Sequence, residues 1–165
     1  MYQTFKMIKM KNYFLIALLF SATSVIAQKT IASLSDTDEL TINVKKLNQT
    51  YAENDFSLWN ELLADDAIVR VNNSIIDKQT ILSGFKGHHS IYNDIKIPEM
   101  IVETKYFKDG SIWTSEWFTW LGTGNKTGVR YSNIGNFNYQ WKDGKIVYLV
   151  CIYDTAGMSM ELGAN

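Results

Sequence analysis

The segment that decides the fold reads Asn54-Asp55-Phe56-Ser57-Leu58-Trp59-Asn60-Glu61-Leu62-Leu63-Ala64-Asp65-Asp66-Ala67-Ile68-Val69. Its Asn-Asp start marks the end of a preceding helix. A second short helix with an apolar face is predicted over 56–63, and Ala-Asp-Asp-Ala then opens a run of β-forming residues that predicts a strand over 67–71. This order of helix, short helix and strand is the most informative part of the chain.

The flanking sequence extends this pattern into one domain. Apolar residues from Leu40 to Tyr51 recur at helical spacing after a helix cap at Asp36 or Thr37, and Asp77 starts a third helix. Past Tyr92 the apolar period changes to two, which predicts strands. These strands are expected over 94–108, 111–121, 128–141 and 145–154, joined by turns at Asp109-Gly110, 122–126 and Asp143-Gly144.

The closing segment, from Trp141 to Tyr153-Asp154-Thr155-Ala156, looks like the last hairpin of SnoaL-like proteins. With the 54–69 segment, it makes the chain resemble the nuclear transport factor 2-like families, which include SnoaL-like polyketide cyclases and ketosteroid isomerases, over roughly residues 38–158. The resemblance implies an α+β, cystatin-like fold, in which three N-terminal helices close a cone-shaped, curved antiparallel sheet. This scaffold hosts enzymes and binding proteins alike, so the fold does not give the function.

The first 27 residues read as an export signal. Lysines precede an apolar run over 13–20, and small residues follow up to Val25-Ile26-Ala27 before Gln28. The apolar run is shorter than the ~20 residues that a membrane span needs. We therefore expect cleavage after Ala27, an exported protein that is periplasmic or secreted, a linker over 28–37, the cone domain over 38–158 and a tail over 159–165.

Composition limits the classes of partner. Cleavage removes three lysines and takes the formal net charge from −1 to −4, so the chain has no basic surface for nucleic acid, and no membrane attachment is expected after cleavage. Cys151 is the sole cysteine, which excludes an intrachain disulfide, and we interpret it as a core residue. Hydrophobic residues make up 46% of the chain, which is ample for a core. No cofactor is expected.

By the resemblance to ketosteroid isomerases, three catalytic positions of that family can be located in this chain. The general base falls on Val71, the oxyanion tyrosine on Leu47 and the oxyanion carboxylic acid near Phe137. All three residues are apolar, so proton transfer of the isomerase type is not expected.

Alternation along the strands places Glu116 inside the cone, next to Trp59, Phe118 and Trp120. A carboxylate with little solvent has a raised pKa, which suits a general acid or base, so Glu116 is the candidate catalytic residue. The alternative is that Glu116 turns to solvent or pairs with Arg130.

The expected ligand pocket combines aromatic and polar side chains. His88 could exchange a proton at the cavity mouth or only end a helix, and Tyr51 could donate into the cavity or bond a backbone carbonyl. His88 and the adjacent His89 diverge by about 100° on a helix, so no metal site is expected. Asp154 is expected to bond the following turn on the outer face. The pocket candidates are Tyr51, Trp59, His88, Glu116, Phe118, Trp120, Asn133 and Phe137.

The outer face of the sheet is expected to be apolar as well, although one face of an antiparallel sheet normally meets water. An apolar second face implies a partner, and the resemblance suggests a homodimer made by packing two sheets together. The interface candidates are Trp113, Trp117, Val150 and Ile152.

Three functions are compatible with these observations. The first is an exported SnoaL-like domain that binds a small apolar ligand in its cone. The second is a hydrolase, isomerase or dehydratase of small hydrophobic molecules that uses Glu116 with Tyr51, Asn133 or His88. The third is a structural or partner-binding module whose cone is filled by its own 22 aromatic residues. Cavity volume separates a ligand site from a filled cone.

Overall fold

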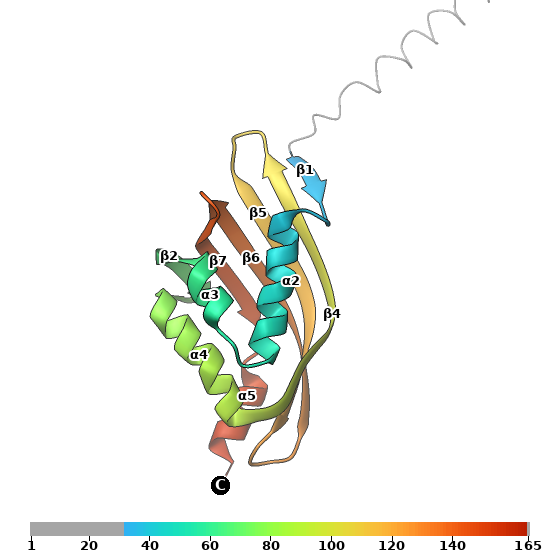
Figure 1. Cartoon of the computed structure of the whole chain (residues 1–165). Coiled ribbons are helices and arrows are strands. Elements are labelled where there is room, and N and C mark those ends of the chain that lie inside the picture. The colour runs from blue at the N-terminus through green and yellow to red at the C-terminus, as the bar shows by residue number, and fades with distance from the viewer. Residues whose placement is uncertain (1–31, 165) are drawn as a thin grey trace, which may run out of the picture. The chain divides into compact units, whose positions relative to one another are not determined.

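Four helices and seven strands make up residues 32–164, the part of the chain that this computed structural model describes (Figure 1). In chain order they are β1 (Ala32–Ser35), α2 (Glu39–Ala52), α3 (Ser57–Leu62), β2 (Leu63–Val71), β3 (Ser74–Ile76), α4 (Lys78–Ile91), β4 (Tyr92–Phe107), β5 (Ile112–Gly124), β6 (Arg130–Lys142), β7 (Lys145–Tyr153) and α5 (Ala156–Gly163).

The seven strands form one sheet in the order β1-β4-β5-β6-β7-β2-β3. Neighbouring strands are antiparallel except β2 and β7, which run parallel, so the sheet is mixed. Figure 1 shows α2, α3 and α4 over one face of this sheet. The space between these helices and the sheet holds the core and the candidate site.

Sequence chemistry explains where the two longer helices begin. The Asp38 carboxylate accepts a hydrogen bond from the Thr41 amide at 2.7 Å, and the Asp77 carboxylate accepts one from the Thr80 amide at 2.8 Å. Each satisfies an amide group that the first turn of a helix leaves without a partner. The first cap is therefore Asp38, not Asp36 or Thr37.

Irregular pairing bends β4, which curves along the sheet in Figure 1. Its register with β5 shifts between Asn93 and Lys96 and again between Lys96 and Glu99, and Asp94 has a positive φ of 51°. Extra residues in one strand of a pair bend that strand and increase its twist. Pro98 lies in this irregular region, where β4 has no neighbour on its other side.

The predicted alternation is confirmed on the central strands. Thr114, Glu116 and Phe118 of β5 are buried, whereas Trp117 between them is 57% exposed. Cys151 of β7 is buried beside Leu149, as expected for a core residue. The β6–β7 turn also follows the prediction, because Asp143 and Gly144 both adopt positive φ.

Several details differ from the expected architecture. The sheet is mixed instead of antiparallel, and the fourth described helix, α5, follows the last strand. Strand β1 lies in the expected linker, and α5 extends from the expected domain end into the expected tail. β1 is a strand because it pairs with residues 104–107 of β4. A segment this short, made mostly of small residues, does not predict a strand from its sequence. The expected export signal lies outside the described residues.

Candidate functional site

A cavity of about 70 Å³ lies between the helices and the inner face of the sheet. Aromatic side chains form most of its wall, and six of them come from β5 and β6 or from the helices α2, α3 and α4. The lining residues are Asn48, Tyr51, Trp59, Phe85, His88, Tyr92, Ile97, Phe118, Trp120, Asn133, Gly135, Phe137, Tyr153, Asp154 and Met158.

Glycine allows one of the aromatic walls to lie close to the sheet. A Cβ atom at Gly135 would lie 2.3 Å from Cζ of Phe118, so the missing side chain makes the room that this ring occupies. The Phe118 ring then meets Phe137 edge to face, with centroids 5.1 Å apart and planes at 90°. This is a favoured aromatic geometry. Position 135 therefore fixes how far Phe118 projects into the cavity.

Three side chains from different elements form a hydrogen-bond relay at the cavity. Trp120 Nε1 donates to the Tyr51 hydroxyl at 3.0 Å, and this hydroxyl lies 2.9 Å from His88 Nδ1. Because the Tyr51 oxygen already accepts from Trp120, its own proton is free for His88 Nδ1. The relay then assigns His88 the neutral tautomer that carries its proton on Nε2.

Burial supports the neutral form of His88. Desolvation, with a smaller contribution from His89, lowers the pKa of His88 from 6.5 to about 4. His88 Nε2 has no hydrogen-bond partner among residues 32–164, and every fully covered side-chain nitrogen or oxygen in this range has one. The Nε2–H group is therefore an unused donor on a residue that lines the cavity.

His89 has a different role from its neighbour. Its Nε2 lies 2.8 Å from the backbone carbonyl of Tyr51, so the Nε2–H group donates to that oxygen and ties the end of α4 to the end of α2. Burial lowers the pKa of His89, and the bond to Tyr51 opposes this effect. His89 is therefore a structural residue, whereas His88 faces the cavity.

Glu116 is fully buried, but it is not among the residues that line the cavity. Tyr139 Oη donates to Glu116 Oε1, and Asn48 Nδ2 donates to Glu116 Oε2. Desolvation raises the pKa of Glu116 from 4.5 to about 7, while these two hydrogen bonds act in the opposite direction. The raised pKa agrees with the prediction from the sequence. The hydrogen-bond partners of the Glu116 carboxylate are Asn48 and Tyr139. Arg130 pairs with Asp94, at 3.0 Å, instead of with Glu116.

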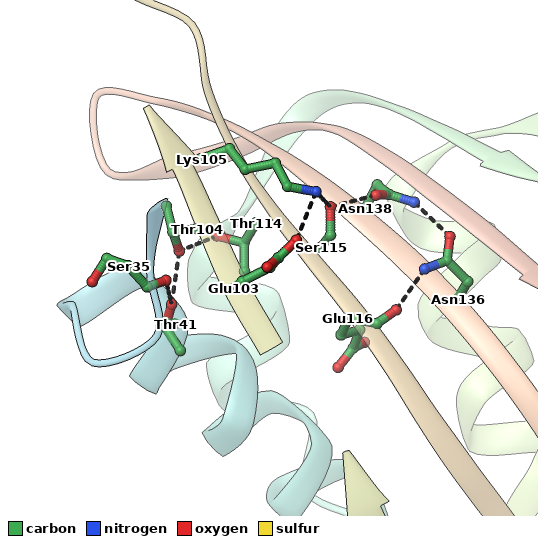
Figure 2. Close-up of polar contacts among 10 residues, drawn as sticks. All are labelled: Ser35, Thr41, Glu103, Thr104, Lys105, Thr114, Ser115, Glu116, Asn136 and Asn138. Atoms are coloured by element: carbon green, nitrogen blue, oxygen red, sulfur yellow. Dashed lines mark hydrogen bonds and ion pairs between the residues drawn. The ribbon is translucent and has the colours of Figure 1, made fainter. Parts of the chain in front are cut away.

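A chain of buried hydroxyl groups lies beside Glu116 (Figure 2). Oγ1 of Thr41 lies 2.8 Å from that of Thr104, which lies 2.9 Å from that of Thr114. Trp141 Nε1 donates to Thr114 at 2.9 Å, so each hydroxyl donates to the next and Thr41 donates to the Ser35 carbonyl at 3.3 Å. None of these threonines lines the cavity, so the chain connects α2, β4, β5 and β6 structurally.

Helix α5 closes the cavity on one side through Met158 and is held by one carboxylate. Glu161 is only 1% exposed. Its oxygens accept from the amides of Lys126 and Thr127 and, at 2.6 Å, from the Thr127 hydroxyl. A Cβ atom at Gly124 would lie 2.1 Å from this carboxylate, so glycine makes the room for it. Burial opposes ionisation, but the hydrogen bonds prevail and lower the pKa of Glu161.

Seven of the eight predicted pocket residues line this cavity, and Glu116 is the exception. Asp154 accepts a hydrogen bond from the Ala156 amide at 2.8 Å, which is the predicted bond to the following turn. Its expected place on the outer face is wrong, because Asp154 lies past the end of β7, where strand alternation no longer applies, and it lines the cavity. Sequence reasoning did not identify Asn48 or Met158. Asn48 lies one residue beyond Leu47 on the predicted apolar face of α2, and that spacing is the signal that was available for it.

The outer face of the sheet carries a row with three exposed apolar side chains. Ile101, Trp117, Asn136 and Ile152 are register neighbours across β4, β5, β6 and β7, and Asn136 is its polar, half-buried member. Ile101 is 72% exposed and Ile152 is 53% exposed. Polar residues of the same face are paired with each other, as Figure 2 shows for Lys105, Ser115 and Asn138. Trp113 and Val150 are half-buried on this face, where Trp113 meets Tyr148 edge to face.

Solved structures of several bacterial proteins superpose on this chain. A candidate polyketide cyclase of Xanthomonas campestris matches with a TM-score of 0.62 and 16% identity, covering 78% of this chain and 100% of that one. IdmH, a candidate polyketide cyclase of Streptomyces antibioticus, matches with a TM-score of 0.58 and 17% identity, covering 77% of this chain and 100% of that one. A candidate isomerase of Bacillus subtilis matches with a TM-score of 0.58 and 16% identity, covering 75% of this chain and 92% of that one.

The fold is that of the SnoaL-like, nuclear transport factor 2-like proteins. Identities this low define the fold of this chain and leave its function open. No protein-family profile matches the sequence, and no curated protein sequence matches it significantly.

Residues 32–164 carry neither a metal-binding cluster nor a membrane-spanning helix. No group of three or more histidine, cysteine, aspartate or glutamate residues there is placed to hold a metal ion. No helix in this range has the length and apolar character needed to cross a membrane.

Proposed function

We propose that this chain is an exported SnoaL-like domain that binds a small, mainly apolar ligand in the cavity between its helices and its sheet. The aromatic lining supports this proposal, because ligand sites are usually apolar concavities with a few placed polar groups. The SnoaL-like fold is compatible with it, since the superposing structures include candidate cyclases and a candidate isomerase.

The observation that carries the proposal is the presence of open polar atoms in an aromatic wall. His88 Nε2 and Asn48 Oδ1 both belong to cavity-lining residues, and neither has a hydrogen-bond partner among residues 32–164. A self-filled core normally pairs its polar atoms, because an unpaired buried group costs about 1–3 kcal/mol. Polar atoms that open on a cavity are instead available to a ligand.

The cavity volume sets the scale of the ligand. About 70 Å³ is well below the several hundred Å³ of a typical pocket for a drug-sized molecule, and one water occupies about 30 Å³ of liquid. The space suits a small molecule or one end of a larger molecule whose remainder passes the mouth at Asp154. The small volume also favours the rival proposal, a structural or partner-binding module whose cone is filled by its own aromatic side chains.

Catalysis is the second alternative, and the geometry changes which residue would perform it. Glu116 lies behind Asn48, so a hydrolase, isomerase or dehydratase could not use Glu116 in direct contact with its substrate. His88 is the imidazole that opens on the cavity, oriented by Tyr51 and Trp120. In an enzyme, the His88 Nε2–H group would contact and polarise a substrate oxygen.

Native mass spectrometry of the protein purified from its own host tests the ligand proposal. A retained small molecule of constant mass is expected. The matched variant is Ile97→Trp, which adds a bulky ring from the cavity wall and is expected to release the ligand without unfolding the chain. A bare wild-type protein, or a ligand that Ile97→Trp retains, would reject the cavity as its site.

We also propose a homodimer formed by the outer face of the sheet, with Trp117 near its centre. The support is the row Ile101–Trp117–Asn136–Ile152, in which three side chains are exposed and apolar and none is charged. A second copy offers the same row, and a two-fold axis would pair them. Trp117→Glu should elute as a folded monomer in size exclusion, because an unpaired buried charge costs several kcal/mol. Ile42→Glu, on the exposed side of α2, is the control. A folded Trp117→Glu dimer would reject this interface.

Export is proposed on the sequence of residues 1–27 alone. Sequencing the N-terminus of the protein extracted from its host should find Gln28. Mature protein that begins at Met1, Met7 or Met10 would reject export by signal cleavage.

A further inference from the structure

The side-chain amide of Asn48 is oriented by two hydrogen bonds that both use its nitrogen. Nδ2 donates to the Val44 carbonyl at 3.2 Å and to Glu116 Oε2. An amide nitrogen has two hydrogens, so both are used and the carbonyl oxygen Oδ1 remains. The reversed amide would place Oδ1 against two acceptors, the Val44 carbonyl and the Glu116 carboxylate. An ionised Glu116 therefore fixes Oδ1 toward the cavity.

Hydrogen bonds consequently orient two polar atoms of the aromatic wall, one an acceptor and the other a donor. The acceptor is Asn48 Oδ1 on α2, and the donor is His88 Nε2–H on α4. No lysine or arginine is among the lining residues, so an anionic ligand would find no countercharge. The one carboxylate of the lining, Asp154, is exposed and accepts from the Ala156 amide, so a cation would find its countercharge at the mouth and the donor hydrogen of His88 inside. A neutral ligand is the class that this wall accommodates.

We infer that the cavity selects a small neutral molecule that carries a hydroxyl or N–H donor for Asn48, and that Glu116 is the positioning residue that sets this preference. The inference rests on the proposed ligand-binding function and names the ligand class. Glu116 itself does not touch the ligand, because Asn48 lies between them. Its role is to hold the amide of Asn48 in one of two possible orientations.

The protonation state of Glu116 gives this preference a pH dependence. The groups that face its carboxylate are Asn48 of α2 and Tyr139 of β6, and Cys151 of β7 lies close enough to interact electrostatically. Burial raises the pKa of both Tyr139 and Cys151 well above their usual values, so neither ionises near neutral pH. Glu116, whose pKa is about 7, is the member of this cluster that titrates there.

Protonation of Glu116 changes what Asn48 offers to the ligand. A protonated carboxyl group needs an acceptor for its hydrogen, and Asn48 Oδ1 provides one after the amide reverses. The reversed amide gains this bond in exchange for its bond to the Val44 carbonyl, so protonation of Glu116 removes the clash with the carboxylate and leaves the one with Val44. The reversed amide presents its NH₂ group to the cavity. The preference for donor ligands is then replaced by a preference for acceptor ligands at low pH.

Isothermal titration calorimetry with three probes tests this inference. Phenol carries a donor and an acceptor, anisole keeps the oxygen but lacks the donor hydrogen, and toluene lacks both. The folded wild-type protein is titrated at about pH 8.5 and about pH 5.5, on either side of the pKa of Glu116. Phenol stays neutral in both, since a phenol ionises near pH 10.

At the higher pH, wild-type protein should bind phenol about tenfold more tightly than anisole, the worth of one good hydrogen bond. At the lower pH this ratio should fall to about one or below. Glu116→Gln should show a low ratio at both pH values, because its amide NH₂ can donate to Asn48 Oδ1 permanently. Glu103→Gln, on the outer face of β4, should behave as wild type.

The outcomes separate the inference from the function on which it rests. If all three probes bind but the phenol-to-anisole ratio is the same at both pH values and in Glu116→Gln, the role of Glu116 is overturned while the ligand cavity stands. If no probe binds wild-type protein, both are overturned. Should Glu116→Gln not fold, Asn48→Leu replaces it, and a phenol preference that survives in Asn48→Leu equally overturns the inference.

Discussion

Replacement of Glu116 by glutamine should remove a pH dependence of stability that the buried carboxyl group creates. The side chain is 0% exposed, and its pKa rises from 4.5 to about 7 on folding, chiefly because burial penalises the charged form. At low pH the carboxyl group is protonated in both the folded and the unfolded chain and costs nothing. As the pH rises from about 4.5 to about 7, the unfolded chain loses its proton first, so the folded state loses relative stability.

The size of this loss follows from the two pKa values. At about 1.4 kcal/mol for each pH unit, the difference between 4.5 and about 7 corresponds to about 3 kcal/mol of unfolding free energy. Above about pH 7 both states are ionised and the contribution is constant. Glu116→Gln has no proton to lose at this position, so its stability relative to wild type should increase by about 3 kcal/mol across this interval.

Urea denaturation of both proteins at intervals from about pH 4 to pH 8 measures this difference. The contributions of other titrating groups cancel when the two curves are subtracted. A constant offset between the curves reports altered hydrogen bonds to Tyr139 and Asn48, and only the slope reports the pKa of Glu116. Glu103→Gln is the control. Parallel curves for wild type and Glu116→Gln would refute the reasoning, since they would mean that folding does not raise this pKa.

Three further perturbations probe the cavity wall and its closure. Tyr51→Phe removes a hydroxyl that bonds both Trp120 and His88 and should lower the unfolding free energy, measured by urea denaturation, by about 1–3 kcal/mol. The ¹⁵N NMR spectrum of His88 should show loss of the Nε2–H tautomer, and an unchanged tautomer would contradict the relay. Gly135→Ala places a methyl group 2.3 Å from Phe118 and should lower stability by about 1–3 kcal/mol, whereas Gly84→Ala, with open space around it, should not. Glu161→Gln should speed hydrogen exchange of α5 more than of α4. In wild type, the protection of α5 from exchange should fall on acidification below the ordinary pKa of 4.5, because folding lowers the pKa of Glu161. Equal exchange in both proteins would reject Glu161 as the anchor.

The sequence predicted what depends on local periodicity. Side chains alternate between the faces of a strand, so the position of Trp117 outside and of Glu116 inside follows from counting along β5. The turn at Asp143-Gly144 follows from the positive φ that these residue types tolerate. The aromatic composition of the cavity wall could also be predicted from the alternation of side chains along the strands.

Contacts between segments that are distant in the sequence could not be predicted from it. Asn48 and Glu116 are separated by 68 residues, and the sequence does not show which residue of α2 will face a given position on β5. The same holds for Glu161 of α5, which meets the β5–β6 turn across 34 residues, and for β1, which is a strand only through β4. Sequence reasoning therefore located the buried carboxylate, and the structure was needed to show that Asn48 separates it from the cavity.

The central claim, that the cavity takes a small ligand, is tested most directly by the indole N–H signals of the five tryptophans during a titration with phenol. Trp59 and Trp120 line the cavity, where Trp59 Nε1 donates to the Leu47 carbonyl at 3.0 Å and Trp120 Nε1 donates to Tyr51. Trp113 and Trp117 lie on the outer face of the sheet and serve as internal controls. We predict saturable shifts of the Trp59 and Trp120 signals with the Trp113 and Trp117 signals unchanged. Shifts confined to Trp113 and Trp117, or no saturable shift at all, would contradict the claim.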